Sequence, residues 1–258
     1  MSQNFCTVTE LAGDDVSVEQ LERLAHRYYW AGEYCRNKDV LEIACGAGQG
    51  LGYLAALAKS LVAGDITPAL VSHAKQHYGD RVAVTEMDAM QLPFPDGSLD
   101  VIILFEAIYY LPSAEQFSKE CHRVLRAGGH VLIATANKDL YDFNPSPQSR
   151  QYYGTVELGK LFHPFGFKCE FFGHMPVEAL SLRQKILRPI KKLVVGMGLM
   201  PKTMAGKKLL KRLVFGRLVQ MPPEIDEKTA SYVAPNFLSE TEPDRRHKVI
   251  YMAACLQN

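Results

Sequence analysis

Residues 40–55 read VLEIACGAGQGLGYLA, an apolar strand pattern that runs into a glycine-rich turn and then into a helical pattern. Glycines in such a turn let the backbone bend tightly and approach a ligand, and the N-terminus of the following helix favours an anionic group. The alternative is a tight strand-to-helix turn that binds nothing. The stretch predicts an α/β unit whose turn is a candidate ligand-binding loop.

The spacing of the glycines narrows the choice of ligand. Gly46, Gly48 and Gly50 follow the pattern GxGxG, whereas dinucleotide-binding loops follow GxGxxG. Glu42 precedes the first glycine by four residues. A diphosphate-binding loop has little use for a carboxylate there, but a loop that faces an ammonium or sulfonium group does. A nicotinamide-dependent oxidoreductase on a similar sheet is therefore the alternative, not the first choice.

Short apolar segments alternate with helical patterns on both sides of this loop. Strands are predicted at 39–44, 60–64, 81–86, 99–105, 129–135, 166–173 and 247–255, and helices at 18–33, 50–59, 67–78, 113–125 and 155–163. Strands rich in Val, Ile and Leu that are spaced by helices predict a parallel sheet covered on both faces. We expect a single α/β domain over residues 1–258, with a helical N-terminal segment over 1–37.

The composition excludes several classes of protein. The chain of 258 residues is 47% hydrophobic and 22% charged, which is typical of a globular protein and not of a disordered or fibrous one. Its six scattered cysteines argue against a disulfide scaffold or a zinc site, and we expect no metal. We see no secretory signal and no apolar run long enough to span a membrane. These features predict a cytoplasmic protein.

Further motifs follow the glycine loop in a fixed order. They are LVAGDITPAL with Asp65, TEMDAMQLPF with Asp88, LPFPDGSLDVIILFEAIYYL, and CHRVLRAGGHVLIAT. With the glycine loop, they resemble the motifs of class I S-adenosylmethionine-dependent methyltransferases over roughly residues 25–175 and the last strand at 247–255. The resemblance implies a Rossmann-like, doubly wound sheet of seven strands with an antiparallel last strand, and S-adenosyl-L-methionine as cofactor.

The resemblance also implies roles for individual residues. Glu42 would lie near the ammonium group of the methionine moiety, Asp65 would accept hydrogen bonds from the ribose, Ile66 would pack on adenine, and Asp88 would meet the adenine amino group. The predicted cofactor-binding residues are Tyr29, Glu42, Gly46, Ala47, Gly48, Gly50, Asp65, Ile66, Asp88, Ala89 and Phe105. Taken singly, Asp65 could be a helix cap and Asp88 a turn former. Three acids at the carboxyl ends of successive parallel strands favour a ligand, because ligands bind at that edge.

The acceptor side is less defined, and we name no catalytic base. Glu106, Tyr109 and Tyr110 follow the fourth strand, where the resemblance implies residues that face the transferable methyl group. These three form the predicted substrate pocket, although both tyrosines could instead pack against the cofactor. The resemblance also implies that one of Arg27, Tyr28 and Tyr29 contacts the cofactor, and we predict that it is Tyr29.

Residues 181–223 hold eleven Lys or Arg and no Asp or Glu, so the rest of the chain carries a net charge of −10. Two amphipathic helical patterns, at 182–199 and 203–219, fall in this region, and we expect a helical basic insertion over about 178–245 between the last two strands. The alternatives are helices with solvated basic faces, a surface for an anionic or lipid-linked substrate, and contact with the inner face of a membrane. Nucleic acid is disfavoured, because FEAIY stands where amino-directed nucleic-acid methyltransferases carry an NPPY-type motif.

The resulting hypothesis is a methyltransferase that acts on oxygen or nitrogen of a small-molecule acceptor. A looser resemblance of residues 137–167 to methyltransferases of bacterial glycan synthesis points to a sugar, a sugar nucleotide or a lipid-linked glycan. A further alternative is a non-catalytic cofactor-binding module that docks a membrane or partner through its basic insertion. The sequence does not indicate an oligomeric state.

Overall fold

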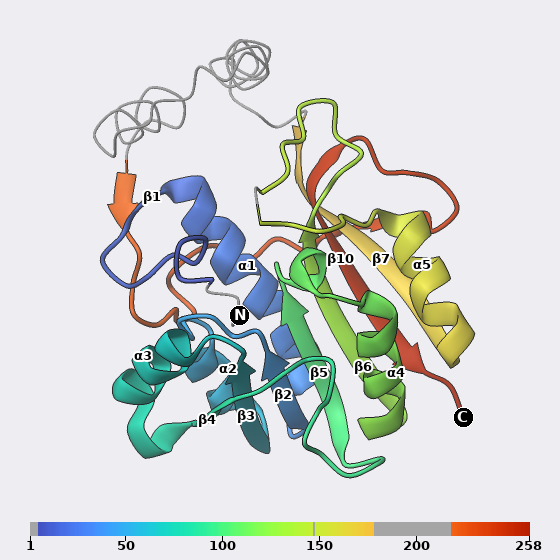
Figure 1. Ribbon diagram of the computed structural model, residues 1–258. Helices are drawn as coiled ribbons and strands as arrows, with labels where there is room; N and C mark the ends of the chain where they lie inside the picture. The colour runs from blue at the N-terminus through green and yellow to red at the C-terminus, as the bar shows by residue number, and fades with distance from the viewer. Residues whose placement is uncertain (1–4, 147, 178–217) are drawn as a thin grey trace.

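One mixed sheet organises the chain (Figure 1). The computed structural model describes residues 5–146, 148–177 and 218–258. The sheet has the strand order β4-β3-β2-β5-β6-β10-β7-β9. Its strands are β2 (Asp39–Ile43), β3 (Ser60–Asp65), β4 (Ala83–Glu86), β5 (Leu99–Phe105), β6 (Leu125–Ala136), β7 (Phe167–Pro176), β9 (Asn236–Leu238) and β10 (His247–Leu256).

The first five strands in this order are parallel. β2 pairs with β3 and β5, β3 pairs with β4, and β5 pairs with β6, all in parallel, whereas β10 runs antiparallel to both β6 and β7. All seven predicted strands are present and the last one is antiparallel, as predicted. The predicted count of seven is wrong for the main sheet, because the described residues add an eighth strand, β9, antiparallel to β7 at the edge. Three residues are too short a run to show strand periodicity in a sequence.

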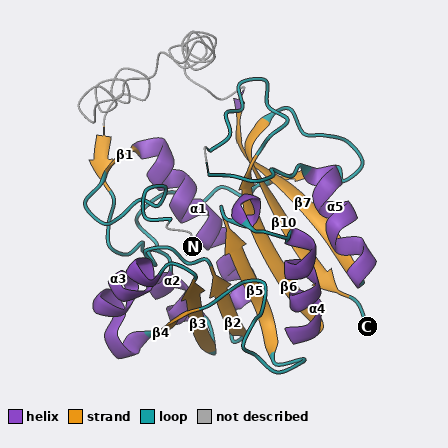
Figure 2. Cartoon of the chain, in the orientation of Figure 1, coloured by secondary structure: helices purple, strands orange, loops and turns teal. Residues whose placement is uncertain are grey.

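Helices cover both faces of the sheet (Figure 2). They are α1 (Val18–Cys35), α2 (Leu51–Leu57), α3 (Pro68–Tyr78), α4 (Ala114–Val124) and α5 (Thr155–Phe162). Alternate side chains of a strand point to opposite faces, so Val101 and Ile103 of β5 pack in the cluster of Trp30 from α1, and Ile102 and Leu104 pack with Phe117 from α4. This explains why β5 reads as a continuous apolar run. The doubly wound α/β fold is as predicted.

Local sequence determines where α1 begins. The Ser17 hydroxyl oxygen accepts a hydrogen bond from the Gln20 backbone N–H at 3.1 Å, and the Gln20 side-chain oxygen accepts one from the Ser17 N–H at 3.1 Å. This capping box satisfies two N–H groups that the helix leaves without partners. It holds the start of a helix whose side chains line the cavity described below.

A small second sheet joins two distant parts of the chain. β1 (Asp15–Ser17) pairs antiparallel with β8 (Leu218–Gln220), so the chain returns beside its N-terminal segment after residue 217. The expectation of a helical segment over 1–37 is correct for α1, but the described residues before it form turns and β1. Most of the predicted helical insertion, 178–217, lies outside the described residues. Residues 218–245 contain β8, β9 and loops where helices were expected. Over the described ranges, no helix has the length and apolar character needed to cross a membrane.

Candidate functional site

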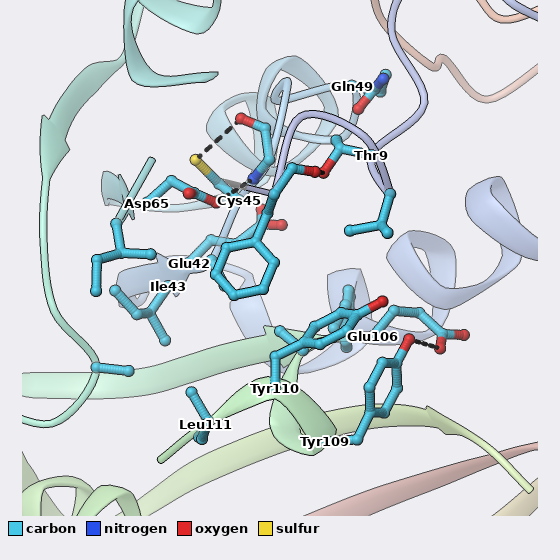
Figure 3. Close-up of a pocket in the computed structure, with 18 of the residues that line it drawn as sticks. Thr9, Glu42, Ile43, Cys45, Gln49, Asp65, Glu106, Tyr109, Tyr110 and Leu111 are labelled. Carbon is cyan, nitrogen blue, oxygen red and sulfur yellow. Dashed lines mark hydrogen bonds between the residues drawn. The ribbon is translucent and has the colours of Figure 1, made fainter. Parts of the chain in front are cut away.

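A cavity of about 280 Å³ lies at the carboxyl ends of β2, β3 and β5 (Figure 3). Parallel strands present these ends at one edge of the sheet, which is where such folds bind ligands. Ten of the fourteen predicted site residues line the cavity: Glu42, Gly46, Asp65, Ile66, Asp88, Ala89, Phe105, Glu106, Tyr109 and Tyr110. The motifs therefore converge on a single cavity.

Glu42 is a buried carboxyl group with one oxygen atom available to a ligand. Only 2% of the residue is exposed. Oε1 accepts a hydrogen bond from the Tyr28 hydroxyl at 2.6 Å, while Oε2 has no hydrogen-bond partner among the described residues. Burial raises the pKa of Glu42 to about 7, against the opposing effects of the Tyr28 hydroxyl and of the Arg27 charge. A bound cation would favour the ionised form and supply the missing partner.

Asp65 ties the glycine loop to the end of β3. Its Oδ2 accepts a hydrogen bond from the Gly46 N–H at 3.0 Å, and its Oδ1 accepts one from the Thr67 N–H at 2.8 Å. Each carboxylate oxygen can accept a second hydrogen bond. Asp65 can therefore hold the loop and bind a ligand hydroxyl at the same time.

Two glycines have conformations or contacts in the glycine loop that a larger residue would not allow. Gly46 has φ 59°, a left-handed conformation that glycine adopts without steric cost, and it lines the cavity. At Gly50 a side chain would overlap the Tyr28 ring, so only glycine lets α1 approach this closely. Ala47, Gly48 and Gly50 are buried and do not line the cavity. Their role is to shape the loop, which differs from the predicted direct contact.

Tyr29 does not line the cavity, so the structure does not support its predicted contact with the cofactor. Its hydroxyl donates a hydrogen bond to the Asp226 carbonyl oxygen at 2.5 Å, and its ring packs against Tyr53 with 5.3 Å between centroids. The preceding residues, Arg27 and Tyr28, line the cavity instead. Consecutive helix residues point about 100° apart, so an error of one position turns the side chain away from the site.

Glu106 and Tyr109 form the other end of the cavity. In Figure 3 their side chains lie together, joined by a hydrogen bond and well separated from Asp65 and Cys45. The Tyr109 hydroxyl donates to Glu106 Oε2 at 3.0 Å, and Arg27 Nη1 lies 4.0 Å from Glu106 Oε1. Burial raises the pKa of both Tyr109 and Tyr110, so both hydroxyls stay protonated at neutral pH.

The backbone is strained at two points of the cavity wall. Ala44 has φ 59° and Glu106 has φ 52°, in the region that residues other than glycine rarely adopt. Each directly follows a strand, β2 and β5 respectively, and each lines the cavity. Such conformations cost about 1–3 kcal/mol and cluster at ligand-binding sites.

Sequence reasoning missed the part of the wall that lies outside the motifs. Phe5, Val8, Thr9 and Glu10 of the N-terminal segment line the cavity, as does Met221 after β8. Hydrogen bonds to backbone carbonyl oxygens hold these two segments in place. The Gln49 side-chain amide donates to the Glu10 carbonyl oxygen at 2.7 Å, and the Gly13 N–H donates to the Met221 carbonyl oxygen at 2.9 Å. Neither segment carries a pattern that indicates ligand binding.

Known proteins resemble parts of this chain. A family model described as a methyltransferase domain matches residues 41–133. A probable S-adenosylmethionine-dependent methyltransferase of Mycolicibacterium smegmatis is 35% identical over 153 residues, which cover 58% of this chain and 56% of that protein. The 27-O-demethylrifamycin SV methyltransferase of Amycolatopsis mediterranei is 33% identical over 100 residues, which cover 36% of this chain and 37% of that protein.

The likeness to solved structures extends further along the chain. YcgJ of Bacillus subtilis superimposes with a TM-score of 0.59 at 16% identity, over 91% of this chain and 99% of that one. At this identity the comparison shows the fold alone. The chain spans about half the length of the first curated relatives that it matches.

Proposed function

We propose, from the premise that this chain belongs to the class I S-adenosylmethionine-dependent methyltransferase family, that it transfers the methyl group of S-adenosylmethionine to oxygen or nitrogen of a small-molecule acceptor. The family match confirms the predicted family and its cofactor, and it favours a methyltransferase over the nicotinamide-dependent alternative. The observation that carries the proposal is the convergence of Glu42, Asp65 and Asp88 on one cavity.

The residues of the cavity suit this cofactor. The Glu42 Oε2 atom, buried without a hydrogen-bond partner, would pair with the methionine ammonium group. Asp65 would accept hydrogen bonds from the ribose hydroxyls. The Ile66 side chain is apolar yet 39% exposed beside the cavity, as a surface for adenine would be. Asp88, whose Oδ1 accepts from the Met90 N–H at 2.8 Å, would meet the adenine amino group.

The cofactor supplies an already activated methyl group, so the chain contributes chiefly position and exclusion of water. Holding two reactants in an attack geometry can supply about 7–11 kcal/mol of the barrier. The N-terminal residues Phe5–Glu10 and Met221 border the cavity and would shield it from solvent. Glu106, Tyr109 and Tyr110 lie at the end where the acceptor would enter.

The identity of the acceptor stays a prediction. A small molecule is supported by a relative whose name states rifamycin methylation. The sugar, sugar-nucleotide or lipid-linked acceptor expected from the sequence belongs in the test panel on equal terms with other hydroxyl and amine compounds. The cytoplasmic location and the contact with the inner membrane face through 182–219 also stay predictions, since that stretch lies almost entirely outside the described residues.

Calorimetry tests the cofactor assignment directly. We expect S-adenosylmethionine and S-adenosylhomocysteine to bind with one site per chain and to raise the melting temperature, and NAD to do neither. The transfer is tested by incubating the protein with methyl-labelled S-adenosylmethionine and a fractionated host extract, and identifying labelled products by mass spectrometry. Binding of the cofactor without any labelled product, together with salt-sensitive binding to anionic vesicles, would favour the non-catalytic module.

A further inference from the structure

Glu106 has the features of a proton acceptor, and among the carboxylates that line the cavity only Glu42 shares them. Glu106 lines the cavity, and its Oε2 accepts a hydrogen bond from the Tyr109 hydroxyl. Its Oε1 is buried and has no hydrogen-bond partner in the described part of the chain. Among the described residues, Arg27 pairs with this oxygen, with Nη1 at 4.0 Å from Oε1. The hydrogen bond to Oε2 thus positions the carboxylate, and Oε1 is left to accept a proton.

Of the remaining carboxylates at the cavity, Asp65 and Glu10 already have other partners. Asp65 accepts two backbone hydrogen bonds, and the Glu10 carboxylate accepts one from the Gln20 side-chain amide at 3.1 Å. Glu42 is the other carboxyl at the cavity with an orphaned buried oxygen, but it lies on β2 beside the glycine loop, where the cofactor is placed. Asp88 is exposed and lies two residues after the end of β4. Glu106 is the carboxylate at the acceptor end.

The residues around Glu106 hold its side chain in place. Arg27 is half-buried, and its guanidinium lies over the Tyr28 and Phe105 rings, with Cζ 5.6 Å and 5.8 Å from their centroids. The Tyr109 ring is stacked on Tyr152 at 4.2 Å, which fixes the hydroxyl that donates to Oε2. The left-handed backbone at Glu106 is the strain expected where a side chain is directed into a site.

We propose that Glu106 is the catalytic base that takes the proton of an acceptor hydroxyl group, and that Arg27 and Tyr109 are its positioning residues. This inference rests on the proposed function. The acceptor oxygen forms its bond to the methyl carbon as the bond from that carbon to sulfur breaks. The electron pair of the broken bond stays on sulfur, and the proton of the hydroxyl passes to Glu106 Oε1.

The test compares the wild type with Glu106→Gln, Glu106→Ala and, as a matched control, Glu22→Gln at an exposed position of α1. The substrate is the hydroxyl compound labelled in the extract or in a panel of alcohols, phenols and sugars. We expect Glu106→Gln to lower kcat by about 10²–10⁴-fold and to remove its pH dependence at the acidic side, since positioned proton transfer contributes that much. Added formate should restore part of the rate of Glu106→Ala but not that of Glu106→Gln, whose amide fills the space.

Binding provides the readout that does not depend on turnover. Glu106→Gln should bind S-adenosylhomocysteine within about threefold of the wild type, a difference of well under 1 kcal/mol. Tyr109→Phe should slow transfer by less than Glu106→Gln does and shift the acidic side of the pH profile, which a purely structural role would not do.

The outcomes separate the two proposals. A wild type that methylates nothing overturns the proposed function and this inference with it. A wild type that methylates a hydroxyl compound, beside a Glu106→Gln variant that is equally fast, overturns the inference alone. A loss of S-adenosylhomocysteine affinity in Glu106→Gln comparable to its loss of rate would place Glu106 in the cofactor site, and also overturns it.

Discussion

At the scale of single residues, the charge of Glu42 governs how the cavity meets a cation. Burial raises the pKa of Glu42 to about 7, so the carboxyl is largely neutral below that pH in the ligand-free protein. A cationic ammonium group gains its partner only when Glu42 is ionised. The affinity for S-adenosylhomocysteine should therefore rise as the pH increases through about 7 and level off above it.

Calorimetry from about pH 5.5 to about pH 8.5 measures this dependence. The Glu42→Gln variant keeps the shape of the side chain and should bind more weakly, with an affinity that no longer follows this titration. An affinity of the wild type that stays flat across the range would show that Glu42 does not face the ammonium group.

Asp65 supports the loop as well as the ligand, and this changes what its removal should do. In Asp65→Ala the Gly46 and Thr67 N–H groups lose their acceptor, so we expect the free energy of unfolding to fall by about 1–3 kcal/mol. We also expect the S-adenosylhomocysteine affinity to fall by about 10- to 100-fold, from lost hydrogen bonds to the ribose. Urea unfolding and calorimetry measure the two effects, and an unchanged affinity would contradict the assignment.

Motif spacing locates cavity residues that lie near strand ends, but not those that lie on a helix. Glu42, Asp65 and Asp88 all line the cavity, as their places near strand ends led us to expect, and their contact with the cofactor stays a prediction. The stretch 27–29 lies on a helix, where only the rotation of α1 about its axis decides which side chain faces the cavity. We predicted that Tyr29 contacts the cofactor, whereas Arg27 and Tyr28 line the cavity.

At the scale of elements, the contact between α1 and the glycine loop holds the cavity wall together. A methyl group at Gly50 would overlap the Tyr28 ring, whose hydroxyl in turn bonds Glu42. Gly50→Ala should therefore lower the free energy of unfolding by about 1–3 kcal/mol, as overpacking does, and weaken S-adenosylhomocysteine binding. Chemical denaturation and calorimetry test both effects.

Gly159 in α5 offers the matched control for this substitution. There an added methyl group would meet its nearest neighbour, the His163 ring, at 3.5 Å, which is ordinary contact. Gly159→Ala should leave binding unchanged and stabilise the helix slightly, because alanine favours helices more than glycine does. If Gly50→Ala were as harmless as Gly159→Ala, the close approach of α1 to the loop would have no energetic importance.

Elements with a clear periodicity were predicted, and elements that depend on a partner were not. The continuous apolar run of β5 and the capped start of α1 follow from local sequence. β1, β8 and β9 have three residues each and exist through pairing with strands distant in the chain. A run this short carries too little pattern to be recognised before its partner is known.

At the scale of the whole molecule, the cavity is closed by pieces that come from opposite ends of the chain. Residues of the stretch 5–10 and Met221 line the cavity at the ends of the sheet strands. A backbone hydrogen bond from the Gly13 N–H to the Met221 carbonyl oxygen joins the two segments. Deleting residues 1–9 should leave the sheet folded, because the strands that the structure describes in it all begin after residue 38. It should weaken S-adenosylhomocysteine binding by about tenfold, or 1.4 kcal/mol.

Far-ultraviolet circular dichroism and calorimetry of the truncated chain test this prediction together. Retained secondary structure with weakened binding is the expected result. Undiminished affinity would show that the N-terminal wall contributes nothing to the ligand, and a loss of secondary structure would show that this segment supports the fold instead.

The sequence by itself determined the alternation of strands and helices, the glycine loop, and the acids at the strand ends, because each depends on residues close together in the chain. Only the tertiary structure decided which face of α1 meets the loop, that Arg27 lies beside Glu106, and that residues 5–10 and Met221 complete the wall. Those contacts join residues that are far apart in sequence, and packing of the whole domain sets their distances. No local pattern records the result of that packing.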